Sequence, residues 1–359
     1  MYLAFMLLSL SHVPSSAADR FEILGQEFKS KEIRGFTQSP DGKYLLGMEG
    51  SVGISNHVYL FHGKDAKEAV TPLINRAMPQ CVDNKGGIIV NYLCSPHFPA
   101  SVERVYRIDA NTTRSIPVTF GDTSNARFHA EGVGPDGGIY GSAGGSAVTD
   151  GPDPRNQTAA VKWIGNQFQE FITEYGSPKA IGPTSGGTLG CVGKRGGGWL
   201  PVIFHLGMDP DYLPLPKGFN AGKPVASNAD GSVILGSVGY GQTDGGTGML
   251  WLKGVPYLLP LVGKRVMREE FTSMTQAGDL AVGLAYLNNG GHGPFVWTPT
   301  AGVQTLEDFA KQKNLAIPTG WFPISCEGVE PNGQFIFGTA LGPNKVMRPF
   351  RLWLTQPST

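Results

Sequence analysis

Residues 225–236 read VASNADGSVILG, a polar run that ends in Asp230-Gly231 and an apolar run that ends in a second glycine, Gly236. Asp-Gly supplies the positive φ of a tight turn, and the apolar residues after the turn are typical of a strand. The stretch therefore predicts a β-hairpin. Similar text recurs along the chain, which indicates that this hairpin is one copy of a repeat.

The repeat is visible in the spacing of its turn glycines. Three other copies keep a second glycine five positions after the turn glycine: SPDGKYLLG, TQAGDLAVG and EPNGQFIFG. Three copies are degenerate: DNKGGIIVN has Asn91 where the second glycine is expected, GPDGGIYG has Gly141 one place early, and PTSGGTLGCVG has Gly186-Gly187. The turn glycines lie 44 to 55 residues apart, near the period of propeller blades, at positions 42, 86, 137, 187, 231, 278 and 333.

A second landmark keeps the same register. A short strand with an aromatic residue follows each turn glycine by 17 to 26 residues, at Tyr59, Tyr106, Trp163, Phe204, Trp251, Trp297 and Trp353. A further apolar segment follows a short turn, so each repeat consists of four strands, A to D. The last repeat lacks a D strand, whereas residues 21–28 (FEILGQEF) belong to no repeat.

These complementary ends predict a closed ring. We expect Phe21–Phe28 to pair beside Pro349–Leu354 and to close an all-β, seven-bladed β-propeller with four antiparallel strands per blade. A pair of β-sandwiches is the alternative, but it does not explain the shared period. In this reading the Asp-Gly turns join strands A and B at one face of the ring, and both glycines are structural.

The composition agrees with a turn-rich β protein. The chain has 51 Gly, 27 Pro and only 16% charged residues, so helix is expected only as one or two turns at Leu306–Leu315. Lys+Arg and Asp+Glu both number 29. No net charge attracts the chain to nucleic acid or anionic lipid, and we expect a monomer.

The N-terminus has the pattern of a secretory signal peptide. Residues 2–10 are an apolar core too short to span a bilayer, and Ser16 and Ala18 are small residues placed for cleavage after Ala18. The segment lacks the usual Lys or Arg, and a buried N-terminal strand is the alternative. We predict a secreted protein in which residues 1–18 are removed and residues 19–359 form one propeller domain, without a membrane span.

Four cysteines occur, at positions 81, 94, 191 and 326. No Cys-x-x-Cys pair is present, which argues against a structural zinc site. Cys81 and Cys94 belong to one blade, and whether they form a disulfide is left open, because a bridge there needs a bulge or a folded-back loop. Cys191 and Cys326 belong to distant repeats and are expected to be separate buried thiols.

The C-terminal repeats show a resemblance to a known family. The segments GHGPFVWTPTAGVQTLEDF, LAIPTGWFPISCEGVEPNGQFIFGTA and RPFRLW resemble the bacterial extracellular HAF-repeat proteins. The match is best over about Thr272 to Leu354 and weak in repeats two to four. The resemblance implies a secreted β-propeller of unknown activity, and it implies no catalytic residues.

The candidate ligand site lies on blades three and four. Binding residues accumulate on loops held by a rigid scaffold, and the longest connection between strands B and C is residues 144–157. We predict that the ligand face carries the polar and aromatic residues of these two repeats: Asp150, Asp153, Arg155, Trp199, His205, Asp209 and Asp211. Oxygen donors on such loops could hold Ca²⁺, but capping of turns by Asp explains them more simply, and no other cofactor is expected.

No catalytic motif stands out in the sequence. A Gly-x-Ser-x-Gly elbow and a sialidase-type Asp box are absent. The pattern favours a secreted binding or scaffold module for an extracellular glycan or protein ligand. The alternative is a hydrolase or lyase acting on extracellular polysaccharide or glycoconjugate, with Asp150, Asp153, His129 and His205 as candidates. Carboxylates and histidines that converge within about 6 Å in the central channel would favour the enzyme.

Overall fold

The computed structural model describes most of the chain between Arg20 and Thr355. The described ranges are 20–28, 32–49, 57–63, 65–68, 77–93, 103–109, 114–117, 127–144, 158–165, 167–171, 178–193, 198–239, 246–262, 266–288 and 290–355.

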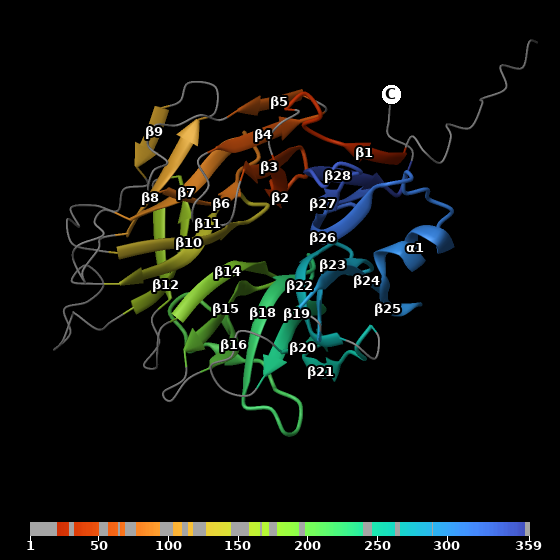
Figure 1. Cartoon of the computed structure of the whole chain (residues 1–359). Coiled ribbons are helices and arrows are strands. Elements are labelled where there is room, and N and C mark those ends of the chain that lie inside the picture. The colour runs from red at the N-terminus through yellow and green to blue at the C-terminus, as the bar shows by residue number, and fades with distance from the viewer. Residues whose placement is uncertain are drawn as a thin grey trace, which may run out of the picture.

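Seven antiparallel sheets of four strands each stand around a central axis as the blades of a propeller (Figure 1). Blades 1 to 3 consist of β2 (Ile33–Gln38), β3 (Tyr44–Glu49), β4 (Val58–His62) and β5 (Asp65–Glu68); β6 (Ala77–Val82), β7 (Gly87–Leu93), β8 (Glu103–Asp109) and β9 (Arg114–Pro117); and β10 (Arg127–Val133), β11 (Ile139–Gly144), β12 (Thr158–Ile164) and β13 (Gln167–Phe171). Blades 4 and 5 consist of β14 (Pro178–Thr184), β15 (Gly187–Gly193), β16 (Trp199–Phe204) and β17 (Asp211–Tyr212); and β18 (Ala221–Ser227), β19 (Val233–Gly239), β20 (Thr247–Leu252) and β21 (Val255–Leu258). Blades 6 and 7 consist of β22 (Val266–Met274), β23 (Ala281–Leu287), β24 (His292–Thr298) and β25 (Gly302–Thr305); and β26 (Phe322–Val329), β27 (Phe335–Leu341), β28 (Met347–Trp353) and β1 (Phe21–Ile23).

The predicted all-β class and the seven blades are confirmed. The first-named strand of each blade is strand A, which lies next to the axis. We call the end of the ring that bears the A–B turns the turn face, and the end that bears the B–C and D–A connections the loop face. The described residues contain one helix, α1 (Leu306–Gln312), which falls where the sequence predicts it. None of the described helices has the length and apolar character needed to cross a membrane.

The two chain ends close the ring in blade 7. Strand β1 pairs antiparallel with β28, with Phe21 opposite Leu352 and Ile23 opposite Phe350, and Figure 1 shows the first and last strands side by side. The Leu24 N–H donates to the Pro349 carbonyl at 2.9 Å. Pairing ends there because Gly25, with φ of +68°, turns the chain away from the sheet. The predicted closure is therefore confirmed for residues 21–24, and the rest of the segment to Phe28 leaves the edge.

Strand A of every blade carries a β-bulge at an equivalent place. The pairing register slips by one residue at Phe36, Gln80, Glu131, Ile181, Val225, Thr272 and Glu327. The second glycine of the repeat lies opposite the residue before this bulge. A Cβ on Gly236 would lie 2.5 Å from the Lys223 carbonyl oxygen and 2.6 Å from the Trp251 ring. The second glycine therefore recurs because two neighbouring strands leave no room for a side chain.

Blade 2 departs from this rule, and one assignment from the sequence is wrong there. Val90 pairs with Pro79, the residue before the bulge, so Val90 and not Asn91 occupies the position of the second glycine. Asn91 instead reaches the next blade. Its buried side chain accepts from the Ala130 N–H at 2.9 Å and donates to the Ala130 carbonyl at 3.1 Å. Asn91 therefore joins blade 2 to blade 3.

Apolar residues of neighbouring blades fill the seams between them, and Cys81 and Cys326 lie in two of these seams. Cys81, Cys191 and Cys326 are buried and free, so Cys191 and Cys326 are separate thiols as predicted. Burial raises the pKa of the Cys191 thiol to about 12, which keeps it protonated and unreactive. Cys94 lies outside the described residues, and Cys81 shows no disulfide.

Candidate functional site

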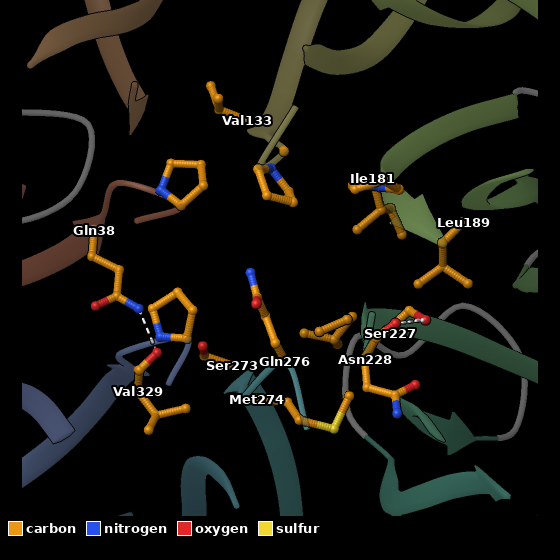
Figure 2. Close-up of a pocket in the computed structure, with 18 of the residues that line it drawn as sticks. Gln38, Val133, Ile181, Leu189, Ser227, Asn228, Ser273, Met274, Gln276 and Val329 are labelled. Atoms are coloured by element: carbon orange, nitrogen blue, oxygen red, sulfur yellow. Dashed lines mark hydrogen bonds between the residues drawn. The ribbon is translucent and has the colours of Figure 1, made fainter. Parts of the chain in front are cut away.

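A cavity of about 410 Å³ occupies the axis of the ring at the turn face (Figure 2). Its wall is made by the ends of the A strands and by the residues that lead into the A–B turns. Three of these turns have a proline as the second of their four residues, at Pro40, Pro135 and Pro331. Proline fixes φ, so this rim is rigid and loses little conformational entropy when a ligand binds.

The polar part of the wall is mostly neutral, and much of it is held in place by hydrogen bonds. The Gln38 side chain donates to the Val329 carbonyl at 2.5 Å, and the hydroxyls of Thr184 and Ser227 lie 2.9 Å apart. Ser273 and Gln276 have no side-chain hydrogen bond within the described residues. Gln276 extends toward the middle of the opening in Figure 2. These two side chains are therefore available to a ligand.

The apolar part of the wall alternates with these groups. Val133, Ile181, Leu189, Met274 and Val329 line the cavity together with the prolines. A concave site with apolar walls and a few placed polar groups, of 300–1,000 Å³, is the usual form of a small-molecule site. No aromatic side chain is found among the described residues of the lining, so this part of the wall offers no ring for stacking on a sugar.

Of the described residues that line the cavity, one is charged, Glu327. It is the bulge residue of β26 and is half-buried. Burial raises the pKa of its carboxyl to about 7, against the opposing effects of the Ser325 hydroxyl and the Arg34 charge. The described residues show no ion pair to Glu327. With a pKa of about 7 the carboxyl is partly ionised at neutral pH, and no described cation forms an ion pair with its charged form.

A second polar cluster lies nearer the loop face, between blades 3 and 4. The Lys179 ammonium lies 2.7 Å from the Glu131 carboxylate, and His129 lies 3.6 Å from the same carboxylate. The Lys179 nitrogen also lies 5.3 Å from the centre of the Trp199 ring. Here the charges neutralise one another, and Trp199 covers the cation.

The structure does not bring the predicted site residues together on one face. Trp199 begins β16 at the loop face, whereas His205 follows the end of the same strand and lies at the turn face. The His205 ring contacts the Gly186 carbonyl at 3.1 Å and the Asp211 carboxylate at 2.9 Å. The single-face prediction is therefore wrong for these residues, because β16 spans the height of the blade between them.

The remaining predicted residues divide into two groups. Asp209 and Asp211 are both exposed; Asp209 lies in the C–D connection of blade 4, and Asp211 begins β17 in contact with His205. Asp150, Asp153 and Arg155 lie outside the described residues. Within the part of the chain that the structure describes, no group of three or more His, Cys, Asp or Glu side chains could hold a metal ion. Asp209 and Asp211 therefore do not belong to a metal-binding group. The Ca²⁺ hypothesis rests on the oxygen atoms of Asp150 and Asp153, which lie outside the described residues.

Sequence reasoning missed the cavity and Glu327. The signal was present in the repeat itself, because the bulge residue lies six positions before the turn glycine in six of the seven blades. In blade 4 the turn glycine with positive φ is Gly186 and not Gly187 as predicted, so the interval there is five. Blade 3 also has a glutamate at this position, Glu131, whereas Phe36, Val225 and Thr272 occupy it in other blades. An alignment of the A strands would have pointed to both glutamates, and the structure shows that Glu327 lines the cavity.

The comparisons with known proteins agree on the fold. No protein-family model matches the chain, and no curated protein sequence matches it either. Among solved structures, an oligogalacturonate lyase from Vibrio parahaemolyticus is similar, with a TM-score of 0.56, 12% identity and 92% of this chain and 93% of that chain covered. An oligogalacturonate lyase in complex with manganese has a TM-score of 0.54 at 9% identity, covering 94% and 91%. An acylaminoacyl peptidase from Pyrococcus horikoshii has a TM-score of 0.51 at 10% identity, covering 93% of this chain and 54% of that one. At these identities the chain shares the β-propeller fold with these proteins, and nothing finer follows.

Proposed function

We propose that this protein is a secreted, non-catalytic binding module that holds an extracellular glycan or protein ligand, or a part of one, in the axial cavity of its turn face. The observation that carries the proposal is the cavity of about 410 Å³ with hydroxyl, amide and apolar walls. Its size and mixed lining are those of a binding site. Its rim is a rigid part of the scaffold, which favours binding without reorganisation.

The composition of the lining supports binding over catalysis. General acid–base chemistry needs at least one group to accept a proton and commonly a second to donate one. Among the described lining residues Glu327 is the single titratable side chain, and no described histidine accompanies it. His129 and His205, the histidine candidates of the enzyme alternative, lie toward opposite faces of the ring.

The test is to narrow the mouth of the cavity and compare ligand capture. Gln276 is exposed at the mouth, so Gln276→Trp should fold normally while its side chain obstructs the opening. Gln334→Trp is the matched control, because Gln334 is an exposed glutamine beside a turn glycine on the same face but outside the lining. Each protein is applied to a glycan array and a peptide array.

The expected result is that ligands captured by the wild-type protein bind Gln276→Trp at least about tenfold more weakly and bind Gln334→Trp within about twofold of wild type. Equal capture by all three proteins would place the ligand outside the cavity. Capture lost equally in both variants would indicate the outer surface of the turn face.

The hydrolase or lyase alternative rests on a shared fold alone. The fold is also that of oligogalacturonate lyases, but a propeller hosts many functions and carries no residues over at 12% identity. The direct check is incubation with polygalacturonate, followed by measurement of new reducing ends and of unsaturated products. Catalytic turnover that Glu327→Gln abolishes would replace the binding proposal with an enzymatic one.

Secretion remains a prediction, because the residues before Arg20 lie outside the described part of the chain. Membership of the HAF-repeat family remains a prediction, because no protein-family model matches the chain. Expression in a bacterium with an intact export system tests secretion. We expect the exported protein to begin at Asp19, as read by N-terminal sequencing. Retention of residues 1–18 in the mature protein would contradict the signal-peptide prediction.

A further inference from the structure

The repeat places a glutamate at the strand A bulge in two blades, and the two carboxylates have different surroundings. Glu131 of blade 3 lies 2.7 Å from the Lys179 ammonium, so its charge is neutralised within the protein. Glu327 of blade 7 lines the axial cavity and makes no ion pair with any described residue. The protein therefore balances one of these charges and leaves the other facing an open cavity.

The groups around Glu327 define what could balance it. Arg34 on the neighbouring strand β2 is the charged group that acts on it, but the Arg34 side chain is exposed and forms no ion pair with it. Ser325 supplies a hydroxyl from the same strand. The rest of the lining is neutral, with hydroxyl and amide groups at Thr184, Ser227 and Gln276. A molecule that fills the cavity thus meets one negative charge in a neutral polar and apolar wall.

We propose that the axial cavity selects ligands bearing a primary ammonium group, which pairs with the Glu327 carboxylate while a neutral polar body contacts the hydroxyl and amide wall. The inference rests on the proposed function, since it names the ligand chemistry of the same cavity. A half-buried carboxylate gains more from a cation than an exposed one, because less water competes for either charge. An amino sugar and a lysine side chain both supply this chemistry.

The probes are matched pairs that differ in charge. The first pair is the disaccharide of glucosamine and its N-acetylated form, and the second is a blocked Gly-Lys-Gly peptide and its N-acetyl-lysine form. Acetylation removes the positive charge and keeps the rest of the molecule. Binding of each probe to the full chain is measured by isothermal titration calorimetry.

Three variants are expected to differ in their affinity for the amine probes. Glu327→Gln keeps the shape and hydrogen-bonding capacity of the side chain but removes its charge, and it should weaken amine binding about tenfold or more. Arg34→Gln removes a cation that repels an ammonium group but also holds the Glu327 pKa down, so the two effects oppose each other and amine binding should stay within about twofold of wild type. Glu307→Gln removes one exposed charge from α1, outside the cavity, and should change nothing.

The outcomes separate this inference from the proposed function. The inference is supported if an amine form binds tightly, its acetylated form binds weakly, and Glu327→Gln loses the binding of the amine form. If the glucosamine disaccharide binds more tightly than the lysine peptide, the natural ligand is a glycan, and if the peptide binds more tightly, it is a protein. Equal binding of charged and acetylated forms, abolished by Gln276→Trp, would overturn the ammonium inference and leave the cavity as the binding site. Failure of every amine probe to bind in a Glu327-dependent way would also overturn it. Unchanged thermal unfolding of Glu327→Gln shows that a lost affinity is not lost folding.

Discussion

In blade 5, Gly236 of strand B lies under the ring of Trp251, whereas in blade 2 Val90 occupies the same place and Ile108 stands where the ring would be. The aromatic residue of strand C pairs with the residue two positions before the glycine, as Trp251 does with Ile234. Blade 2 has Ile88 opposite Ile108 in that position. In blade 2, the larger residue on strand B (Val90 in place of glycine) therefore occurs together with the smaller residue on strand C (Ile108 in place of tryptophan).

The same pairing holds in other blades. Phe61 lies against Gly47 in blade 1, and Phe204 lies against Gly190 in blade 4. In each case the aromatic residue pairs two positions before the glycine, at Leu45 and Thr188. In blades 1, 4 and 5 the second glycine and the aromatic ring are therefore one packing unit whose total volume is limited. Blade 7 differs, because Leu352 occupies the place of the ring and a Cβ on Gly338 would meet the Ser325 carbonyl instead.

The largest expected effect comes from adding one methyl group in blade 5. In Gly236→Ala the new Cβ meets the Lys223 carbonyl oxygen at 2.5 Å, and backbone cannot yield as a flexible side chain can. We expect the free energy of unfolding to fall by about 3 kcal/mol. Denaturant unfolding followed by tryptophan fluorescence measures it.

Gly182→Ala provides the matched control. Gly182 follows the bulge on strand A of blade 4, and no atom lies within 4 Å of a Cβ built there. Its free energy of unfolding should stay within about 0.5 kcal/mol of wild type. An equal loss in both variants would mean that glycine flexibility, and not crowding at the bulge, accounts for the repeat.

The next effect tests how blade 2 is joined to its neighbour. Asn91→Leu keeps the buried volume but removes both hydrogen bonds to Ala130, leaving a buried backbone donor and acceptor unsatisfied. We expect a loss of about 2 kcal/mol in the free energy of unfolding. Thr339→Val in blade 7 removes a single bond to the Gly35 N–H at 3.0 Å and should cost about half as much. A larger loss for Thr339→Val would contradict the assignment of Asn91 as the stronger tie.

The sequence predicts those features of the fold that depend on one strand or one turn, and it does not predict those that depend on contacts between strands or blades. The turn glycines and the short aromatic strands are local patterns, and they predict the number of blades and the closure by residues 21–24. The displaced second glycine of blade 2 was not predictable in this way. It depends on where strand A bulges at Gln80, and a bulge is set by contacts across the seam rather than by the strand's own residues.

The candidate site shows the same division. Loop length directed attention to Trp199 and His205, although four alternating strands already imply that a segment after strand C returns to the turn face. The described lining of the axial cavity comes from six different blades, so no single repeat reveals it. Glu327 was detectable only by comparing the same position across blades, since a lone glutamate in a strand has no special spacing.

The seam between blades 5 and 6 leads to a smaller effect, which depends on pH. Glu269 is fully buried there; one carboxyl oxygen accepts from the Val262 N–H at 2.5 Å, and the other has no partner among the described residues. Burial raises the pKa of this carboxyl. Because the native pKa is above that of the unfolded chain, about 4.3, the stabilisation is fully present below that pH and is lost as pH rises through the native pKa.

Glu269→Gln should remove this dependence. The amide stays neutral, so at pH 8 the variant should be more stable than wild type by about 1 kcal/mol, and the difference should shrink toward pH 4. Thermal unfolding between pH 4 and pH 8 measures it, with Glu270→Gln on the neighbouring residue as control, since Glu270 is ion-paired with Arg268 at 3.2 Å. If the wild type instead became more stable relative to Glu269→Gln as the pH rises, the carboxyl of Glu269 would not be neutral in the folded protein, and the prediction would be wrong.

The smallest effect is also the most direct test of the comparison between blades 5 and 2. Trp251→Ile gives blade 5 the strand C residue of blade 2. It removes the ring that a Cβ on residue 236 would meet at 2.6 Å, but it leaves the Lys223 carbonyl where it is. Gly236→Ala should therefore cost less in the Trp251→Ile background than in wild type, by roughly 0.5 kcal/mol, as a double-mutant cycle measures it. If the cost is the same in both backgrounds, the ring and the glycine do not share a limited volume. The co-occurrence of Val90 with Ile108 would then have no packing cause.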